Sequence, residues 1–350
     1  MTQSPSTAPT QQGPASAAYL DPHLLATVGP LDLRARMAVE GLMTGMHRSP
    51  LHGFSVEFAQ HRPYTFGDDP RFLDWKVYAR TDKLYLKQYQ QETNLDMLLL
   101  VDASGSMGYG SGLDRKLRDE TPQSQRTRGG GGGRWRKYDH AATLVAAMSY
   151  VALRQQDRVG VVVFDNEVRT ATRLSNTQGH WRSIVEALEQ TQIAEDANPA
   201  ALALSTEDAN ARASVFATLF DRVVARLTRR SLVVLVSDLF DDADLLERGL
   251  ARLQHRRHDA IIFQTLDPAE RQFPFRDPSE FLGLEGEGRL PLDPAALRQH
   301  YLEALEAHLE RVEQVARRFH FDHLLLDTAR PLAPPLSHFL AKRAAVIARS

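Results

Sequence analysis

Five near-continuous apolar runs constrain the fold of this chain more than any other feature of the sequence. The runs are residues 96–101, 158–164, 231–237, 259–265 and 321–327. Amphipathic stretches typical of helices lie between and after them, at about 138–156, 179–190, 213–229, 242–256, 294–319 and 334–348. Apolar strands that alternate with helices are typical of a mainly parallel sheet covered on both faces. The pattern therefore predicts a doubly wound α/β domain.

A shorter segment and the region before the first run complete the expected architecture. Residues 167–174 alternate apolar and polar side chains close behind the second run, so we expect an antiparallel strand at the sheet edge. Residues 1–20 are rich in Ser, Thr, Pro, Gln and Ala, a composition typical of a disordered tail. We therefore expect a tail, an N-terminal helix and β region over 21–94, and the α/β domain over 95–350.

The N-terminal region carries its own structural signals. A helical pattern covers roughly Leu31 to Met46, and alternation in "KLYLKQY", residues 83–89, indicates a strand. A polar–aromatic cluster between them comprises Asp68, Asp69, Arg71, Asp74, Trp75 and Arg80. We interpret this cluster as ion-paired packing with Trp75 in the core, and keep a docking surface or a support for the loop after residue 102 as the alternative.

Composition excludes several classes of site and partner. The chain has 350 residues, a formal net charge of −2 and no cysteine, so disulfides, thiolate zinc sites and cysteine nucleophiles are excluded. The small net charge gives no electrostatic reason to expect nucleic acid or an anionic membrane as the main partner. The first residues lack the basic start and apolar stretch of a secretory signal, and no run reaches the roughly 18 apolar residues of a membrane helix. We expect a cytoplasmic protein.

A glycine-rich insertion at about 112–137 interrupts the α/β pattern. It carries eight Lys and Arg residues and five consecutive glycines. Polyglycine does not offset its own ordering entropy, so the segment favours a flexible surface loop. The alternative is an RNA-binding arm, which predicts salt-sensitive RNA binding that is lost when residues 114–137 are deleted.

The string "DASGSM" places an oxygen-bearing side chain at every second position just after the first apolar run. Asp102, Ser104 and Ser106 would point the same way in an extended loop, and hard oxygens are the ligands that Mg²⁺ prefers. Asp238 follows the third run. If the two strands are neighbours, both carboxylates meet at one sheet edge, where doubly wound sheets bind their ligands. The sequence therefore predicts a divalent-cation site.

Other interpretations of this motif are weaker. A serine-hydrolase elbow needs G-x-S-x-G and a phosphate loop needs a lysine after its glycines, and the motif has neither. A helix N-cap also favours Asp and Ser. An enzymatic alternative stays open, in which Asp102 and Asp238 hold a metal that activates water for phosphoester hydrolysis. Against it, the sequence near the motif offers no second carboxylate cluster and no evident general base.

These residues carry a resemblance to known families. "DASGSM" looks like the metal-ion-dependent adhesion site of von Willebrand factor A domains. Residues 47–111, which include "RPYTFGDDPRFLDWKVYART", resemble the signature of the bacterial domain of unknown function 58 family. "DRVGVVVF", "RRSLVVLVSDLFDD" and "LDPAERQFPF…EFLGLE" extend the resemblance over roughly residues 45–350, apart from the insertion. It implies a von Willebrand factor A-like fold preceded by a small β-containing region.

The resemblance also implies a metal-dependent protein–protein interaction module, not an enzyme. The positions that match its ligands are Asp102, Ser104, Ser106 and Asp238. The family's threonine position falls on Ser214, with Thr206 and Thr218 nearby as alternatives. Mg²⁺ is the implied ion, and Mn²⁺ or Ca²⁺ could occupy the same oxygens. Family members are commonly encoded beside MoxR-type AAA+ ATPases, which implies an adaptor that works with such an ATPase, or a client that supplies an acidic ligand to the metal.

Overall fold

The structure is a computed structural model that describes most of the chain. The described residues are 21–46, 61–65, 73, 75–87, 95–111, 135–165, 167–191, 220–222, 225–240, 243–284 and 288–348. By its internal contacts the chain divides into two compact units. The smaller unit is Met46–Asn94, and the larger combines Met1–Gly45 with Leu95–Ser350.

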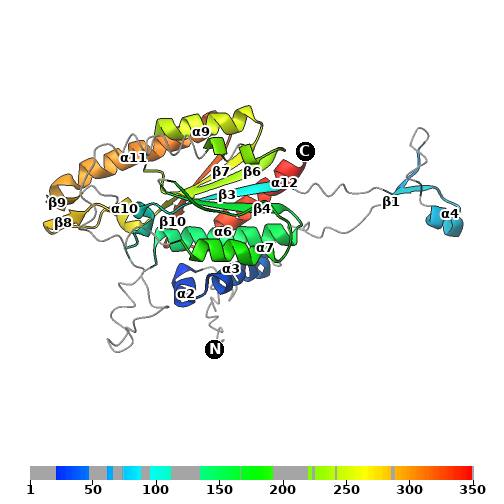
Figure 1. Ribbon diagram of the computed structural model, residues 1–350, viewed down its shortest axis with the longest axis horizontal. Helices are drawn as coiled ribbons and strands as arrows, with labels where there is room; N and C mark the ends of the chain where they lie inside the picture. Colours follow the sequence, from blue (N-terminus) through cyan, green and yellow to red (C-terminus); the bar gives the residue numbers. More distant parts are fainter. Residues whose placement is uncertain are drawn as a thin grey trace, which may run out of the picture. The chain divides into compact units, whose positions relative to one another are not determined.

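A six-stranded sheet forms the centre of the larger unit (Figure 1). Its strands in spatial order are β10 (Asp322–Asp327), β7 (Asp259–Leu266), β6 (Ser231–Ser237), β3 (Asp96–Asp102), β4 (Arg158–Phe164) and β5 (Val168–Ala171). Every neighbouring pair is parallel except β4 and β5, which are antiparallel. The predicted doubly wound sheet and its antiparallel edge strand are confirmed, and the five apolar runs begin and end within one residue of the observed strands.

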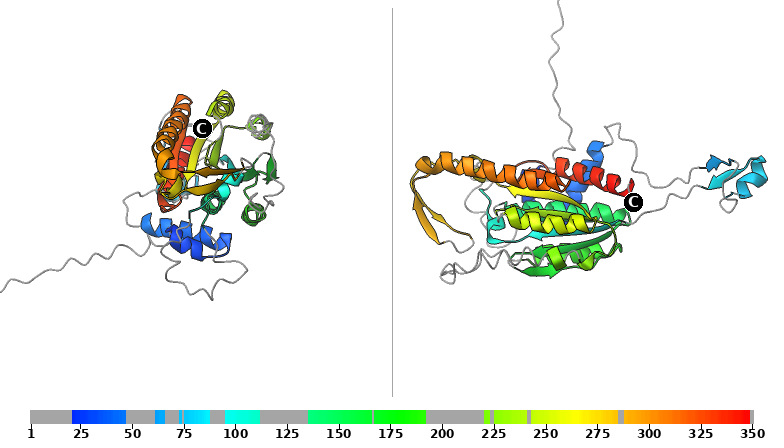
Figure 2. Two further views of the ribbon diagram at one scale, coloured as in Figure 1. Left: turned by 90° about the vertical axis from the view of Figure 1, so that its left-hand side faces the viewer. Right: turned by 90° about the horizontal axis from the view of Figure 1, so that it is seen from above.

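Helices cover both faces of this sheet (Figures 1 and 2). One face carries α6 (Lys137–Arg154) and α7 (His180–Glu189), and the other carries α9 (Ala243–His255) and α11 (Pro294–Arg318). Helix α12 (Ala333–Ala348) packs against α6. These five helices confirm their predicted positions. Of the helix expected over 213–229, only part lies within the described residues, and residues 220–222, 225 and 226 are helical.

The strands bury side chains on both faces, which explains their continuous apolar runs. All seven residues of β3 and all seven of β6 are buried. Leu98 and Leu100 belong to a core cluster with Leu250 of α9 and Val312 of α11. Successive residues of a strand point to opposite faces, so Leu99, between Leu98 and Leu100, faces the α6 side. A two-sided core of this kind requires apolar residues at every position.

Helix α3 (Leu31–Met46), preceded by α2 (Pro22–Thr27), contacts α6 and α7 through Arg36, whose guanidinium lies over the rings of Tyr150 and Trp181. The Leu31 N–H donates to Glu189 Oε1 at 3.0 Å, and the Arg36 guanidinium lies 4.9 Å from the centre of the Trp181 ring. The helix predicted over Leu31 to Met46 is thus confirmed, and it belongs by these contacts to the larger unit.

Among its described residues, the smaller unit contains a two-stranded antiparallel sheet and one short helix. The elements are β1 (His61–Pro63), α4 (Trp75–Thr81) and β2 (Tyr85–Lys87). The strand predicted in "KLYLKQY" is confirmed by β2. The prediction that Trp75 is a core residue is wrong, because its side chain is 61% exposed and packs edge-on against Tyr78. A seven-residue helix in so small a unit offers little surface to bury an indole. Asp68, Asp69, Arg71 and Asp74 lie outside the described residues.

Two features near the carboxyl ends of the strands were not expected from the sequence. Helix α10 (Pro268–Gln272) follows β7, and an antiparallel hairpin of β8 (Ser279–Leu282) and β9 (Arg289–Leu292) precedes α11. The hairpin strands have four residues each and are mostly exposed, so they lack an apolar run.

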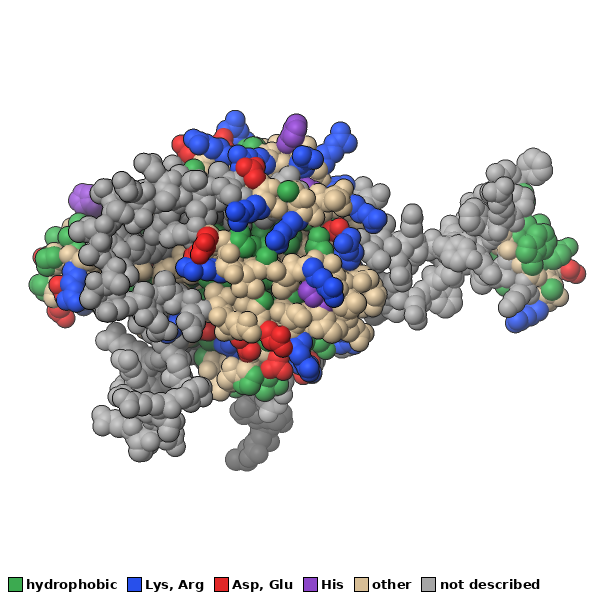
Figure 3. Space-filling model, viewed as in Figure 1, with side chains coloured by type: hydrophobic (Ala, Val, Ile, Leu, Met, Phe, Trp, Pro, Cys, Tyr) green, Lys and Arg blue, Asp and Glu red, His purple; other side chains and the backbone are tan. Residues whose placement is uncertain are grey.

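Charged side chains of both signs lie on the described surface of the chain. Over the described part of the face in Figure 3, Lys and Arg side chains are spread from top to bottom with Asp and Glu among them. No helix of the described residues is long and apolar enough to cross a membrane. The expected tail over 1–20 and residues 112–134 of the expected insertion lie outside the described residues.

Candidate metal centre

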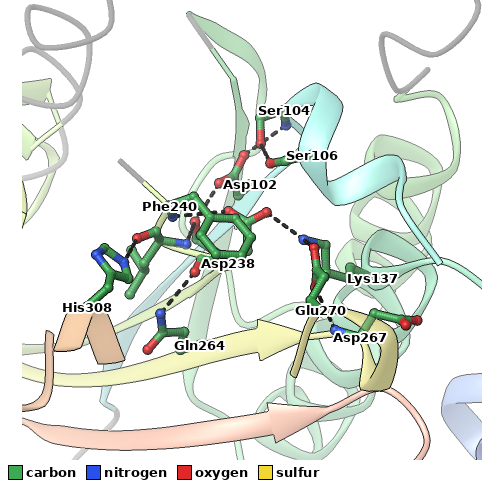
Figure 4. A network of polar contacts seen from close by, with 12 residues as sticks. Asp102, Ser104, Ser106, Lys137, Asp238, Phe240, Gln264, Asp267, Glu270 and His308 are labelled. Atoms are coloured by element: carbon green, nitrogen blue, oxygen red, sulfur yellow. Dashed lines mark hydrogen bonds and ion pairs between the residues drawn. The ribbon is translucent and has the colours of Figure 1, made fainter. Parts of the chain in front are cut away.

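The strand β3 ends in a buried carboxylate. Asp102 is its last residue, and only 3% of Asp102 is exposed. Its Oδ1 accepts a hydrogen bond from the Ser104 backbone N–H at 2.8 Å, and its Oδ2 accepts one from the Ser237 hydroxyl at the end of β6 (Figure 4). Donors from two neighbouring strand ends therefore fix the orientation of this carboxylate.

Two hydroxyls follow the carboxylate in a single turn. Ser104 precedes the 3₁₀ turn η2 (Gly105–Gly108), and Ser106 lies within it. Their Oγ atoms are 3.1 Å apart. Adjacent oxygens in an octahedral Mg²⁺ site with ligands at about 2.0–2.1 Å are ~3.0 Å apart. The spacing of the two hydroxyls therefore fits neighbouring ligands of one small divalent cation.

Asp238 follows the neighbouring strand β6. The strands β3 and β6 pair directly, with Val101 opposite Val236, so their ends lie side by side. Asp238 is 3% exposed. The strand that follows β3 along the chain, β4, lies on the opposite side of β3, so the boundary between β3 and β6 is the topological switch point of the sheet. The structure thus brings the carboxylates of Asp102 and Asp238 to the edge where such sheets bind ligands.

A lysine that the sequence analysis did not single out reaches into the same network. Lys137 is the first residue of α6, and its side chain is fully buried. Its ammonium donates to Asp238 Oδ2 at 2.8 Å and to Glu270 Oε1 of α10 at 2.6 Å. The nitrogen also lies 4.9 Å from the centre of the Phe240 ring. Asp238 therefore forms an ion pair with a buried cation (Figure 4).

Gly110 keeps the start of α6 against the serine loop. A Cβ atom at Gly110 would lie 2.1 Å from the Trp135 carbonyl oxygen, which no side chain tolerates. The adjacent Tyr109 carbonyl accepts a hydrogen bond from the Lys137 backbone N–H at 2.9 Å. This close approach of two backbones places the Lys137 side chain within reach of Asp238.

The pKa values of the network reflect its burial. Burial, and then the charge of Asp238, raise the pKa of Asp102 to about 7. Burial alone would lower the pKa of Lys137, but Asp238 and Glu270 outweigh it and hold that pKa above its usual value. Burial also raises the pKa of Glu270, against the opposing effect of Lys137. Lys137 therefore stays protonated, whereas the ionised form of Asp102 is destabilised when no cation lies beside it.

Ser237 and His308 hold the loop after β6. Ser237 Oγ accepts the Leu239 N–H at 3.0 Å, and Leu239 adopts a left-handed conformation with φ of 56°. The Leu239 carbonyl lies 2.6 Å from His308 Nε2 of α11. Phe240, the next residue, is 43% exposed. The loop therefore presents an aromatic ring to solvent beside the buried carboxylates.

Other expected site residues are not placed by the structure. Ser214, Thr206 and Thr218 lie outside the described residues. No group of three or more His, Asp or Glu side chains suited to a metal occurs among the residues that the structure describes. The centre consists instead of two carboxylates and two hydroxyls.

The missed residues left partial signals in the sequence. A lysine at the first position of a helix is unfavourable beside the positive end of the helix dipole, which indicates nearby anions. Glu270 belongs to "DPAE", a capping box in which Asp267 and Glu270 bond to each other's backbone N–H groups at the N-terminus of α10. These signals indicate charged residues at the N-termini of α6 and α10, but they do not reveal that the side chains of Lys137 and Glu270 are in contact.

Several known proteins are similar to this chain. Uncharacterized proteins of Mycobacterium bovis and Mycobacterium tuberculosis are 23% identical over 329 residues, which covers 92% of this chain and 90% of each relative. Two solved structures are similar at low identity. The conserved hypothetical protein BatB from Bacteroides thetaiotaomicron has a TM-score of 0.42 and 11% identity, covering 73% of this chain and 100% of that one. An aerotolerance-related membrane protein from Bacteroides fragilis has a TM-score of 0.41 and 10% identity, with the same coverage.

A family model supplies the classification. The model described as protein of unknown function DUF58 matches residues 60–311, which is more than half of the chain. The matched range contains the two carboxylates, the two hydroxyls and Lys137. The chain belongs to the DUF58 family.

Proposed function

We propose that the chain is a protein-binding module that depends on a divalent cation. Asp102, Ser104 and Ser106 would hold Mg²⁺, and Asp238 would lie beside it as a second source of negative charge. Mn²⁺ and Ca²⁺ suit the same oxygens. The bound ion would supply a positive position for a carboxylate from a partner protein. The observation that carries this proposal is the convergence of two buried carboxylates and two hydroxyls at the switch point of the sheet.

The charges in the network support a divalent ion. With Asp102 ionised, the buried carboxylates of Asp102 and Asp238 and the partly exposed carboxylate of Glu270 face one ammonium, that of Lys137. Three negative charges and one positive charge leave a net charge of −2. Buried charge without compensation is costly, so a dication at this position would stabilise the ionised centre.

The motif "DASGSM" supports a more specific assignment of the domain and its site. We propose that the larger unit is a von Willebrand factor A-like domain whose centre is a metal-ion-dependent adhesion site, and that Ser214 or a neighbouring threonine supplies a further hydroxyl. The partner would be a MoxR-type AAA+ ATPase or its client, with the chain as a cytoplasmic adaptor in assembly or maturation. The support for this partner is the resemblance of "DASGSM" and of residues 47–111 to those families.

A retention experiment tests the proposal. The immobilised wild-type chain should retain the purified MoxR-type ATPase of the same genome in Mg²⁺ buffer and release it in EDTA. Asp102→Asn and the double variant Ser104→Ala/Ser106→Ala should fail to retain it in either buffer. Asp96→Asn is the matched control, because Asp96 is equally buried at the other end of β3, about 20 Å away, and should behave as the wild type does.

Two results would contradict the proposal. One is retention that survives both EDTA and Asp102→Asn, because binding would then not involve the centre. The other is metal-dependent hydrolysis of p-nitrophenyl phosphate that Asp102→Asn abolishes and Asp96→Asn preserves. That result would favour the phosphoester hydrolase instead.

A further inference from the structure

The buried ammonium of Lys137 is the strongest feature of the network that the proposed function does not use. Its side chain has no solvent exposure, and its two ion-pair partners come from separate elements, Asp238 after β6 and Glu270 in α10. The Phe240 ring lies beside the nitrogen at 4.9 Å. A charge buried this completely keeps a fixed position, because leaving either carboxylate unpaired in the interior is costly.

The ammonium serves only part of the acidic centre. It bonds to Asp238 Oδ2, whereas Asp238 Oδ1 has a long contact of 3.5 Å with the Phe240 N–H. Among the described residues, no Lys, Arg or His forms an ion pair with Asp102, whose hydrogen bonds come from a hydroxyl and a backbone N–H. The sharing of positive charge is therefore unequal: Asp238 has a permanent counter-ion and Asp102 does not.

This arrangement places two cations in competition for one carboxylate. A divalent ion held by Asp102, Ser104 and Ser106 would gain from the charge of Asp238, but Lys137 already neutralises much of that charge. The ammonium would also repel the ion directly, and screening by water is weak at a buried site. We infer that Lys137 is an internal competitor of the divalent cation for Asp238 and sets a low intrinsic metal affinity for the centre, an inference that rests on the proposed function.

Glu270 has the opposite role in this competition. Its Oε1 accepts from the ammonium, and its Oε2 accepts from the Asp267 N–H at 2.7 Å, so the carboxylate is fixed to the start of α10. Glu270 thereby takes up part of the charge of Lys137. Without it, the full charge of the ammonium would act on Asp238 and on the metal position.

The test compares the Mn²⁺ affinities of the wild type and of charge variants. Each affinity is measured from the electron paramagnetic resonance signal of free Mn²⁺, and Mg²⁺ is then added as a competitor. Lys137→Met should bind Mn²⁺ at least about tenfold more tightly than the wild type, and Glu270→Gln should bind it more weakly. A purely structural role would weaken binding in both variants or change neither. Far-UV circular dichroism checks that each variant is folded.

A double variant covers the risk that Lys137→Met does not fold, since that change removes the ion-pair partner of the buried Asp238 and of Glu270. Lys137→Met/Glu270→Gln removes one charge of each sign and should bind Mn²⁺ at least about tenfold more tightly than Glu270→Gln alone. The loss of Lys137 is then measured in a background where Glu270 no longer needs a partner.

The outcomes separate this inference from the proposed function. If the wild type binds Mn²⁺ and removing Lys137 leaves the affinity equal or weaker in both backgrounds, the inference is overturned and the metal-dependent function stands. If only the variants without Lys137 bind, the inference stands and the metal-dependent function of the natural chain is overturned. If none of the four proteins binds, both are overturned.

Discussion

Asp102 is a carboxylate whose surroundings oppose its own charge. It is buried at the end of β3, it faces the charge of Asp238, and its neutralising contacts are hydrogen bonds from Ser104 and Ser237 rather than an ion pair. Lys137, the nearest cation of the network, bonds to Asp238 instead. Residues in this condition are typical of functional sites, because the environment is arranged for a ligand and not for the stability of the free protein.

The charge of Asp102 predicts how a neutral substitution changes stability. Its pKa in the folded protein is raised to about 7, so its contribution to stability is present below the unfolded pKa of about 3.9 and is lost as pH rises through 7. In EDTA at pH 8, Asp102→Asn should therefore raise the melting temperature by roughly 2–6 °C, with a smaller gain at pH 5, because the loss of stability builds up between the unfolded and folded pKa values. Differential scanning calorimetry at both pH values measures this. A variant that is less stable than the wild type at pH 8 would show that Asp102 is not electrostatically strained.

Among the helices and strands, the way an element packs decides whether the sequence predicts it. The apolar runs predicted β3, β4, β6, β7 and β10 closely because strands buried on both faces need apolar residues at every position. The hairpin of β8 and β9 was missed because its short strands are largely exposed and gain their order from pairing with each other. Helix ends were predicted within about two residues because capping residues and the end of amphipathic spacing mark them.

Close packing between α9 and the helical segment at Phe220 gives a prediction for one glycine. A Cβ atom at Gly249 of α9 would lie 2.3 Å from the fully buried Phe220 ring. Gly249→Ala should therefore destabilise the protein by about 1–3 kcal/mol, despite the gain of ~1 kcal/mol in helix propensity. Urea denaturation measures the change. Gly179→Ala, at the open N-cap of α7 with nothing within 4 Å of its Cβ position, is the control and should change stability by less than about 0.5 kcal/mol. Equal effects in the two variants would contradict the packing argument.

At the scale of the whole molecule, the order of the strands creates the centre. The chain passes from β3 to β4 on one side and later returns to place β6 on the other, so residues 136 positions apart, Asp102 and Asp238, become neighbours. Alternating strands and helices predicted the parallel sheet, and the convergence was expected only on the condition that the two strands are neighbours. The sequence could not reveal the partners of Lys137, because they lie 101 and 133 residues away in contacts that depend on the exact packing of α6 and α10. Ser214 lies outside the described residues, so its assignment stays a prediction.

Buried histidines across the fold predict sensitivity to acid. Burial lowers the pKa of His140 to about 4 and also lowers those of His180, His258 and His323. A lowered pKa stabilises the fold above the unfolded value of about 6.5, and this contribution is lost as pH falls toward the folded value. As pH falls from 7 to 4.5, the histidines therefore destabilise the fold, against the opposite effect of Asp102. Over this range the melting temperature of His140→Phe should change in the more stabilising direction than that of the wild type. An identical change in the variant would show that His140 does not contribute.

Asp102 and its neighbouring hydroxyls should hold a divalent cation. Isothermal titration of Mg²⁺ into the wild type, Asp102→Asn and Asp96→Asn tests it most directly. Binding should be saturable at one site in the wild type and in Asp96→Asn. The affinity of Asp102→Asn should be at least about tenfold weaker, since a neutral amide gives up the charge–charge attraction. Binding of equal strength in all three proteins, or none in the wild type, would contradict it.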